Sequence, residues 1–181
     1  MDLKRKKIFI AGHKGLVGSS ILKEMKRKSI EPITIEKQEL DLLDQYNVDK
    51  WFRVNKPEMV ILAAARVGGI YANNKYPVQF ILENLKIQTN VIEASFNCNV
   101  EKLLFLGSSC VYPKDSPQPI KEEYLLTSKL EQTNEAYAIA KIAGLKLCQA
   151  YKKQYNCNFF TVMPSNIYGP NDNFHPLNSH V

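Results

Sequence analysis

A serine, a tyrosine and a lysine are the residues of this 181-residue chain whose types and spacing best suggest chemistry. Tyr137 and Lys141 are one helical turn apart, so a helix would place both side chains on one face. The lysine ammonium would favour the phenolate and lower the pKa of the tyrosine from its reference value of about 10. The phenol can then exchange a proton with a substrate oxygen near neutral pH, while the Ser108 hydroxyl hydrogen-bonds the same oxygen.

The Tyr-x-x-x-Lys spacing is not specific by itself. It occurs three times in the chain, beginning at Tyr46, Tyr71 and Tyr137. Only the third lies on a long helical pattern downstream of an apolar run that ends at Gly107 and Ser108. Position in the chain, rather than the spacing, therefore selects Tyr137 as the candidate proton-transfer group.

Three spaced glycines near the N-terminus predict a dinucleotide-binding loop. Gly12, Gly15 and Gly18 follow a strand-like segment and open a helix-like one, which is the placement that such a loop needs. The first glycine permits a tight turn, the second lets the backbone approach a pyrophosphate, and the third lets the helix pack close to the sheet. The free N–H groups of the helix N-terminus would then face the phosphates.

Residues near the end of the second predicted strand bear on the choice between NAD and NADP. An acidic residue there would hold a ribose 2′-hydroxyl, whereas basic residues would hold the 2′-phosphate of NADP. The chain offers both, because Glu36 stands beside Lys37, and Lys14 lies in the glycine loop. Lys14 and Lys37 can clamp a phosphate together while Glu36 points to solvent, so the residues favour NADP(H).

Strand-like and helix-like segments alternate along the first 163 residues. This alternation predicts an α/β fold in which a Rossmann-like, doubly wound parallel sheet carries helices on both faces. The segment 59–65 is apolar throughout, which predicts a strand buried on both faces. The predicted strands are 7–11, 32–36, 59–65, 102–107 and 158–163, and the predicted helices are 16–28, 46–55, 77–97 and 131–155.

The composition changes after residue 163. Residues 164–181 are rich in proline, asparagine and glycine and contain no helical or strand pattern. A structureless stretch of that length is uncommon inside a compact domain. We therefore expect residues 1–163 to form one NADP-binding domain. Residues 164–181 would begin a smaller C-terminal substrate-binding region that is missing from this chain.

Bulk composition narrows the class of protein. The longest apolar run, 59–65, is too short to span a bilayer, and the N-terminus lacks the features of a signal peptide, so we expect a cytoplasmic location. The four cysteines form no Cys-x-x-Cys pair, so we expect neither a zinc site nor a disulfide framework. The net charge of +6 belongs to solvated surfaces rather than to a nucleic-acid site, because no aromatic residues interleave with the lysines.

Six segments together resemble one known family. They are AGHKGLVG (11–18), AAARVGGI (63–70), LFLGSSCVYP (104–113), NEAYAIAKIAG (134–144), PSNIYGP (164–170) and DNFHPLNSHV (172–181). The chain is similar through these segments to the GDP-L-fucose synthases, which are extended short-chain dehydrogenase/reductases acting on nucleotide sugars. The resemblance implies epimerisation at C3 and C5 and NADPH-dependent reduction at C4 of GDP-4-keto-6-deoxymannose.

The resemblance also adds two proton-transfer residues, Cys110 and His180. By themselves these residues would be taken for a buried thiol and a solvated histidine. A ketone at C4 acidifies the protons on C3 and C5, and inversion removes a proton from one face and returns one to the other. Thiol and imidazole groups, with reference pKa values of about 8.5 and 6.5, suit that work.

The site residues that the resemblance implies fall into two groups, with no metal ligands. Those assigned to catalysis are Ser108, Cys110, Tyr137, Lys141 and His180. Those assigned to the cofactor are Gly12, Lys14, Gly15, Leu16, Val17, Gly18, Lys37, Asp41, Leu42, Leu106, Gly107, Lys141, Pro164, Asn166, Ile167 and His180.

Two other functions remain open at this stage. One is another nucleotide-sugar enzyme of the same fold, either a 4-epimerase or a 4,6-dehydratase. A dehydratase would carry an Asp-Glu pair shortly after the catalytic serine, whereas Ser109 and Cys110 stand there. The other is a truncated, non-catalytic cofactor-binding module. Whichever function holds, we expect the helices 77–97 and 131–155 to pair across a homodimer.

Overall fold

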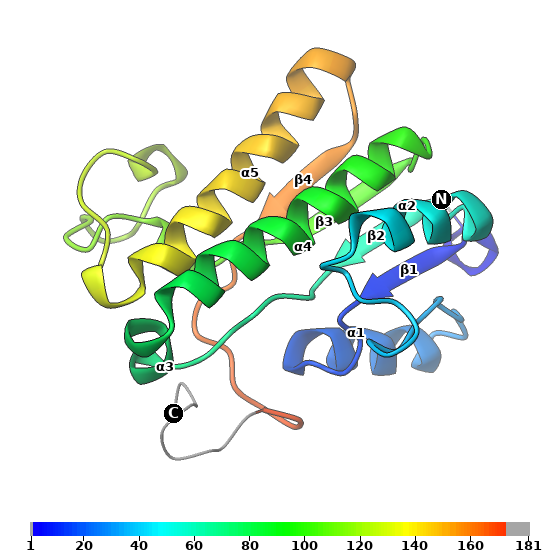
Figure 1. The fold of residues 1–181 in the computed structure, drawn as a ribbon, viewed down its shortest axis with the longest axis horizontal. Helices are drawn as coiled ribbons and strands as arrows, with labels where there is room; N and C mark the ends of the chain where they lie inside the picture. The colour runs from blue at the N-terminus through cyan, green and yellow to red at the C-terminus, as the bar shows by residue number, and fades with distance from the viewer. Residues whose placement is uncertain (1, 173–181) are drawn as a thin grey trace.

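Four parallel strands form the centre of the computed structural model, which describes residues 2–172 (Figure 1). The strands lie in the order β1-β2-β3-β4, with Ile8 opposite Met59 and Leu106 opposite Val162. Each crossover between them carries at least one helix, as parallel strands require. The strands are β1 Ile8–Ala11, β2 Met59–Leu62, β3 Lys102–Leu106 and β4 Phe159–Val162.

Helices cover the two faces of the sheet unequally. Three of them, α2, α4 and α5, lie over the near face in Figure 1, and α4 and α5 run side by side. The α-helices of residues 2–172 are α1 Leu16–Arg27, α2 Gln45–Asn55, α3 Ile70–Lys75, α4 Pro77–Asn97 and α5 Glu135–Tyr155. Short 3₁₀ turns occupy Leu3–Arg5, Ser109–Val111, Glu122–Tyr124 and Gln132–Asn134. Within residues 2–172, none of these helices has both the length and the apolar character needed to cross a membrane.

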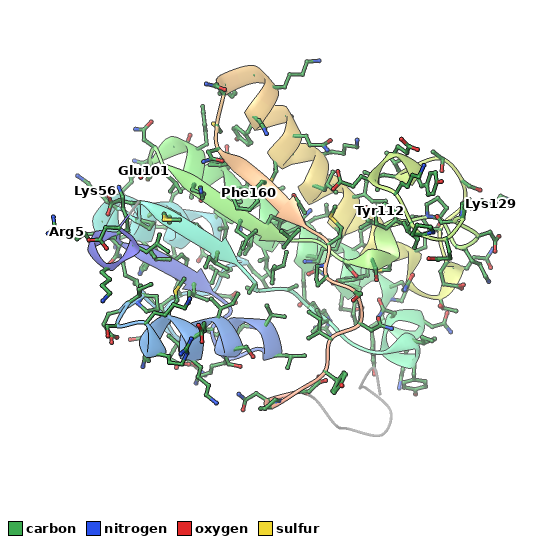
Figure 2. The ribbon with its side chains drawn as sticks, turned by 180° about the vertical axis from the view of Figure 1, so that it is seen from behind. Arg5, Lys56, Glu101, Tyr112, Lys129 and Phe160 are labelled. Carbon is green, nitrogen blue, oxygen red and sulfur yellow. The ribbon has the colours of Figure 1, made fainter. Side chains whose placement is uncertain are left out.

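The strand residues are buried to different degrees on the two faces of the sheet. Every residue of β1 is buried, because the Phe9 ring packs on Trp51 and Phe52 of α2 while α1 packs on β1 from the other side. In β4, Phe159 is buried against α5, whereas Phe160 is 38% exposed on the opposite face, which Figure 2 turns toward the viewer. The described residues therefore bury both faces of the sheet only around β1.

Two strand predictions need correction. The segment 59–65 is not buried on both faces: the strand ends at Leu62, and Met59 and Ile61 are partly exposed on the face that few helices cover. The segment 32–36 does not form a strand. Only Ile33 bridges to β1, accepting from the Ile10 N–H (3.0 Å) and donating to the Ile8 carbonyl (2.7 Å).

One feature on each side of Ile33 explains why this strand fails to extend. Pro32 has no N–H to donate to a ladder. The chain then turns at Glu36, whose carbonyl accepts the N–H groups of Glu39 and Leu40 (both 3.0 Å). The single bridge still leaves this segment beside β1, on the side opposite β2.

The start of α5 and its packing position the candidate catalytic residues. The helix begins at Glu135 rather than at residue 131, because Gln132–Asn134 forms a 3₁₀ turn. It crosses β3 closely at Gly144, where a Cβ atom would lie 2.7 Å from the Phe105 ring and 2.8 Å from the Gln88 amide carbon. This close approach sets the N-terminal half of α5 over the carboxyl end of β3.

Candidate active site

One cavity of about 800 Å³ opens at the carboxyl ends of the strands. It lies beside β1, which pairs with Ile33 on one side and with β2 on the other, so that the strand order reverses there. Ligands of open α/β sheets bind at such a reversal of strand order. Its walls come from the glycine loop after β1, the segments after β2, β3 and β4, and the N-terminal part of α5.

The cavity gathers every described residue that the sequence predicted for catalysis or for cofactor binding. These residues are Gly12, Lys14, Gly15, Leu16, Val17, Gly18, Lys37, Asp41, Leu42, Leu106, Gly107, Ser108, Cys110, Tyr137, Lys141, Pro164, Asn166 and Ile167. The prediction for His180 lies outside the described residues. Among residues 2–172, no group of three or more His, Cys, Asp or Glu side chains is arranged to hold a metal ion.

A thiol and two hydroxyls meet at the end of β3. The Ser108 Oγ lies 2.8 Å from the Cys110 Sγ and also accepts the Cys110 backbone N–H at 3.4 Å. Both contacts arise because Ser108 caps the 3₁₀ turn Ser109–Val111. The Tyr137 phenol is near enough for the Ser108 hydroxyl to lower its pKa. A single substrate carbonyl oxygen at this point could therefore reach both hydroxyls with the thiol beside it.

Burial dominates the electrostatics of this cluster. It raises the pKa of the Tyr137 phenol above its ordinary value of 10, and the nearby Cys110 sulfur acts in the same direction. The Ser108 hydroxyl opposes this rise. Burial also raises the pKa of the Cys110 thiol, with Ser108 and Lys141 acting against it. Both groups thus hold their protons at neutral pH in this structure.

The lowered tyrosine pKa expected from Lys141 is therefore wrong for this structure. Lys141 is 3% exposed, and its ammonium donates to the Leu106 carbonyl at 2.8 Å. It also lies over the rings of Phe105 (4.8 Å) and Tyr137 (5.7 Å). Burial lowers the pKa of Lys141 itself to about 8, which weakens its ability to stabilise a phenolate.

The glycine loop has the shape that a dinucleotide pyrophosphate needs. Gly12 adopts a φ of +92°, and a Cβ there would lie 2.5 Å from the Ala64 backbone nitrogen. A Cβ on Gly18 would collide with the Gly12 carbonyl oxygen. Gly15 has room around it, and as the N-cap of α1 it offers no side chain to occupy the first N–H groups of the helix. These residues fit a bound pyrophosphate.

An ion pair connects the glycine loop to the segment beside β1. The Lys14 Nζ lies 2.6 Å from one Glu36 carboxylate oxygen, and the His13 Nε2 lies 3.6 Å from the other. The Glu36 side chain, predicted to point to solvent, is 41% exposed but is also held by the glycine loop. Lys14 holds the pKa of this carboxyl below its usual value, with a smaller effect from His13.

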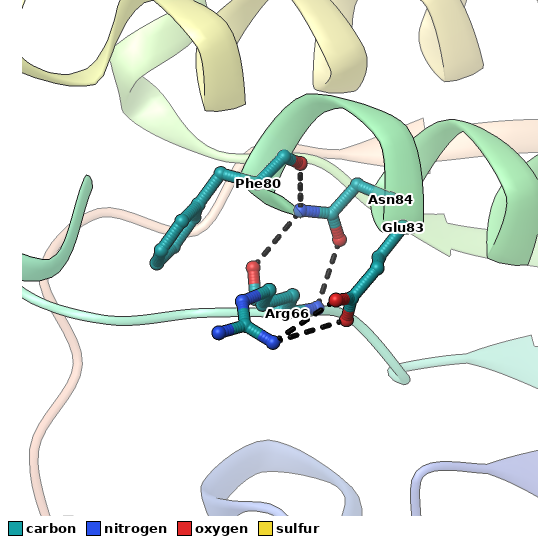
Figure 3. Close-up of polar contacts among 4 residues, drawn as sticks. All are labelled: Arg66, Phe80, Glu83 and Asn84. Carbon is teal, nitrogen blue, oxygen red and sulfur yellow. Dashed lines mark hydrogen bonds and ion pairs between the residues drawn. The ribbon is translucent and has the colours of Figure 1, made fainter. Parts of the chain in front are cut away.

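Sequence reasoning missed a polar cluster in the cavity wall that Figure 3 draws. The Arg66 Nη1 lies 3.1 and 3.2 Å from the two Glu83 carboxylate oxygens, and the guanidinium carbon lies 5.5 Å from the centre of the Phe80 ring. Asn84 accepts the Arg66 N–H (2.9 Å) and donates to the carbonyls of Arg66 (2.9 Å) and Phe80 (2.7 Å). The Phe80 ring in turn meets Tyr137 edge-on at 6.3 Å. The sequence carried no signal for this cluster, because Asn84 is one of several polar residues buried along α4, with Gln88 and Ser95.

The parallel strands carry a glycine loop and a cavity at their carboxyl ends. This arrangement defines the class of Rossmann-like dinucleotide-binding proteins. The model of the NAD dependent epimerase/dehydratase family matches residues 8–181. The chain belongs to this family.

Named relatives sharpen the comparison. GDP-L-fucose synthase 1 of Arabidopsis thaliana is 57% identical over 182 residues, covering 100% of this chain and 56% of the plant protein. The GDP-L-fucose synthase of Escherichia coli K12 is 51% identical over 180 residues, covering 99% of this chain and 56% of that relative. The similarity to GDP-L-fucose synthases predicted from the sequence segments is thereby confirmed. The chain spans about half the length of these relatives.

A solved structure agrees with the computed fold. GDP-D-glycero-L-gluco-heptose synthase from Campylobacter jejuni, determined in the presence of NADPH, matches with a TM-score of 0.95 at 41% identity. The match covers 100% of this chain and 53% of the Campylobacter chain. The predicted α/β, Rossmann-like fold class is confirmed.

Proposed function

We propose that this chain supplies the cofactor site and the catalytic residues of a GDP-L-fucose synthase. The reaction would invert C3 and C5 and reduce C4 of GDP-4-keto-6-deoxymannose, with NADPH as the reductant. The observation that carries the proposal is the thiol beside the two hydroxyls, with the Cys110 Sγ 2.8 Å from the Ser108 Oγ. A reductase needs only the hydroxyls, whereas inversion at carbon also needs a group that exchanges protons with carbon.

The cluster divides the chemistry between its members. Ser108 and Tyr137 would hold the C4 oxygen, so that charge developing there during enolisation or reduction is met by two hydrogen-bond donors. The C4 ketone acidifies C3 and C5, and the Cys110 thiol is the neighbouring group that can exchange a proton with those carbons. His180 remains the second such group in this proposal. Tyr137, which holds its proton in this structure, would deliver it to the C4 oxygen when that carbon is reduced.

NADP(H) is the cofactor that this proposal assigns to the cavity. The glycine loop would hold its pyrophosphate, Lys14 and Lys37 its 2′-phosphate, and Lys141 the nicotinamide ribose. When bound, NADPH supplies a hydride for C4. The steric fit of the loop and the family model support a nicotinamide dinucleotide, and the NADPH named with the Campylobacter structure supports the NADP(H) form.

The remaining predictions about the whole protein belong to the same proposal. Residues 1–163 would form the cofactor domain and 164–181 the start of a smaller region that binds the GDP-sugar. The chain's coverage of about half of its relatives supports this division. A cytoplasmic homodimer would pair α4 and α5, which carry exposed apolar side chains at Val78, Leu82 and Ile139.

Deuterium exchange tests the role of Cys110. The full-length protein is incubated with GDP-4-keto-6-deoxymannose and NADPH in deuterated water, and product identity, label at C3 and C5, and NADPH oxidation are followed together. Cys110→Ser should lose the label at C3 and C5 and still bind NADPH. Cys98→Ser, a thiol outside the cavity, is the matched control. Unchanged labelling in Cys110→Ser would remove the thiol from the mechanism. NADPH oxidation without inversion in the parent protein would replace the proposal by a simple C4 reductase.

A further inference from the structure

Glu36 forms an ion pair with the glycine loop inside this cavity. It stands between Lys14 and His13 of the glycine loop, at 2.6 and 3.6 Å, and all three residues line the cavity. Lys14 and Lys37 are the basic residues available for a cofactor phosphate at this end. Glu36 therefore already holds the cation that such a phosphate would need.

The two nicotinamide cofactors would meet this carboxylate differently. NADP carries a 2′-phosphate on the adenosine ribose, and NAD carries a hydroxyl there. A hydroxyl can donate a hydrogen bond to a carboxylate that keeps its lysine partner. A 2′-phosphate is repelled by the carboxylate and must compete with it for the ammonium. The same side chain thus favours one cofactor and opposes the other.

The ion pair is exposed enough to be exchanged. The side chain of Lys14 is 72% exposed and that of Glu36 is 41% exposed. Pairs of this kind contribute only a small factor to stability, and salt screens them. A bound phosphate can therefore displace the carboxylate, but with a measurable loss of affinity. The Glu39 carboxylate, which accepts the Glu36 N–H at 3.3 Å, adds further negative charge at this end of the cavity.

We propose that Glu36 sets the preference between NADPH and NADH by competing with the cofactor 2′-phosphate for the Lys14 ammonium. The consequence is a chain that binds NADH much closer in affinity to NADPH than Lys14 and Lys37 alone would allow. This inference rests on the proposed function, in that the cavity must hold a nicotinamide dinucleotide.

Dissociation constants of NADPH and NADH, measured by nucleotide fluorescence, test the inference without any turnover. Glu36→Gln removes the charge and keeps the shape. It should lower the dissociation constant of NADPH about threefold to tenfold, while that of NADH stays constant or rises. Glu31→Gln is the matched control, because Glu31 is exposed and does not line the cavity. It should change neither constant by more than about twofold.

A second pair of variants asks whether Glu36 acts through Lys14. In a Lys14→Gln background the ammonium is absent and only the direct repulsion of the 2′-phosphate is relieved, so adding Glu36→Gln should improve NADPH binding clearly less than it does in the unaltered chain. Glu36→Thr repeats the single substitution with an unrelated neutral side chain, and thermal melting checks that each variant is folded.

The outcomes separate this inference from the proposed function. If both cofactors bind and neither neutral replacement of Glu36 changes their ratio, the competition does not exist. An equally large gain in the Lys14→Gln background would also overturn the inference, because the effect would not pass through Lys14. If neither cofactor binds the unaltered chain, the dinucleotide site itself, and with it the proposed function, is wrong.

Discussion

Asn84 offers a sharp test of how the cavity wall is held in place. Its side chain makes the three hydrogen bonds drawn in Figure 3, two to the backbone of Arg66 and one to the Phe80 carbonyl, and the residue is only 2% exposed. Asn84→Ala removes all three bonds and leaves the backbone N–H and carbonyl of Arg66 without their asparagine partner. Because each lost bond is worth roughly 1 kcal/mol, we expect the unfolding free energy to fall by about 3 kcal/mol.

Urea and thermal unfolding without nucleotide measure this loss. For a chain of this size it corresponds to a fall in Tm of about 6–12 °C. Asn90→Ala is the matched control. Asn90 lies on the same helix and is 7% exposed, but its amide donates one such bond, to the Leu42 carbonyl at 2.9 Å. It should lose only about 1 kcal/mol.

Comparing the two variants tests whether the three bonds of Asn84 stabilise the fold more than the single bond of Asn90. A loss in Asn84→Ala no larger than that in Asn90→Ala would refute the reasoning, because it would mean that the Arg66 backbone gains little from its asparagine partner. A large loss accompanied by weaker NADPH binding would link this wall to the cavity that it lines. A large loss with unchanged binding would confine the effect of Asn84 to stability.

Two further predictions concern the packing of α5. Gly144→Ala should lower the unfolding free energy by about 1–3 kcal/mol, because the added Cβ would meet Phe105 and Gln88 at 2.7 and 2.8 Å. Thermal melting measures this, and an unchanged midpoint would contradict the close contact. Burial lowers the pKa of Lys141 to about 8 from 10.5, so the unfolded chain binds more protons between these pH values. Stability relative to Lys141→Met should therefore rise from about pH 8 toward pH 10.5 in urea titrations, and a constant difference would argue against the buried ammonium.

Local sequence patterns predicted the structure correctly wherever it depends on residues that are close together in the chain. The spacing of Gly12, Gly15 and Gly18 predicted a loop that opens a helix, and the structure has α1 beginning at Leu16. Ser108 and Cys110 are two residues apart, so one 3₁₀ turn brings their side chains together. Alternating apolar and helical segments likewise predicted the parallel sheet, since each periodicity belongs to one type of element.

Local sequence patterns failed where the structure of a segment depends on residues far from it in the chain, or where the segment is too short to show a pattern. The helix Ile70–Lys75 was not predicted, because six residues are too few to show a helical period. The segment 32–36 has a strand-like composition, yet its edge position and the turn at Glu36 leave a single bridge at Ile33. The Asn84 clamp on Arg66 joins residues 18 positions apart, and nothing in the spacing marks it.

By itself, the sequence determined the alternation of strands and helices, the glycine loop, and the family to which the chain belongs, because these depend on periodicity and on motifs carried by adjacent residues. Only the tertiary structure decided the state of the site. The buried ammonium of Lys141 turns to the Leu106 carbonyl, the phenol of Tyr137 keeps its proton, and Glu36 reaches back to Lys14. The physical reason is that charge and desolvation depend on which groups surround an atom in space, and those neighbours are distant in the chain.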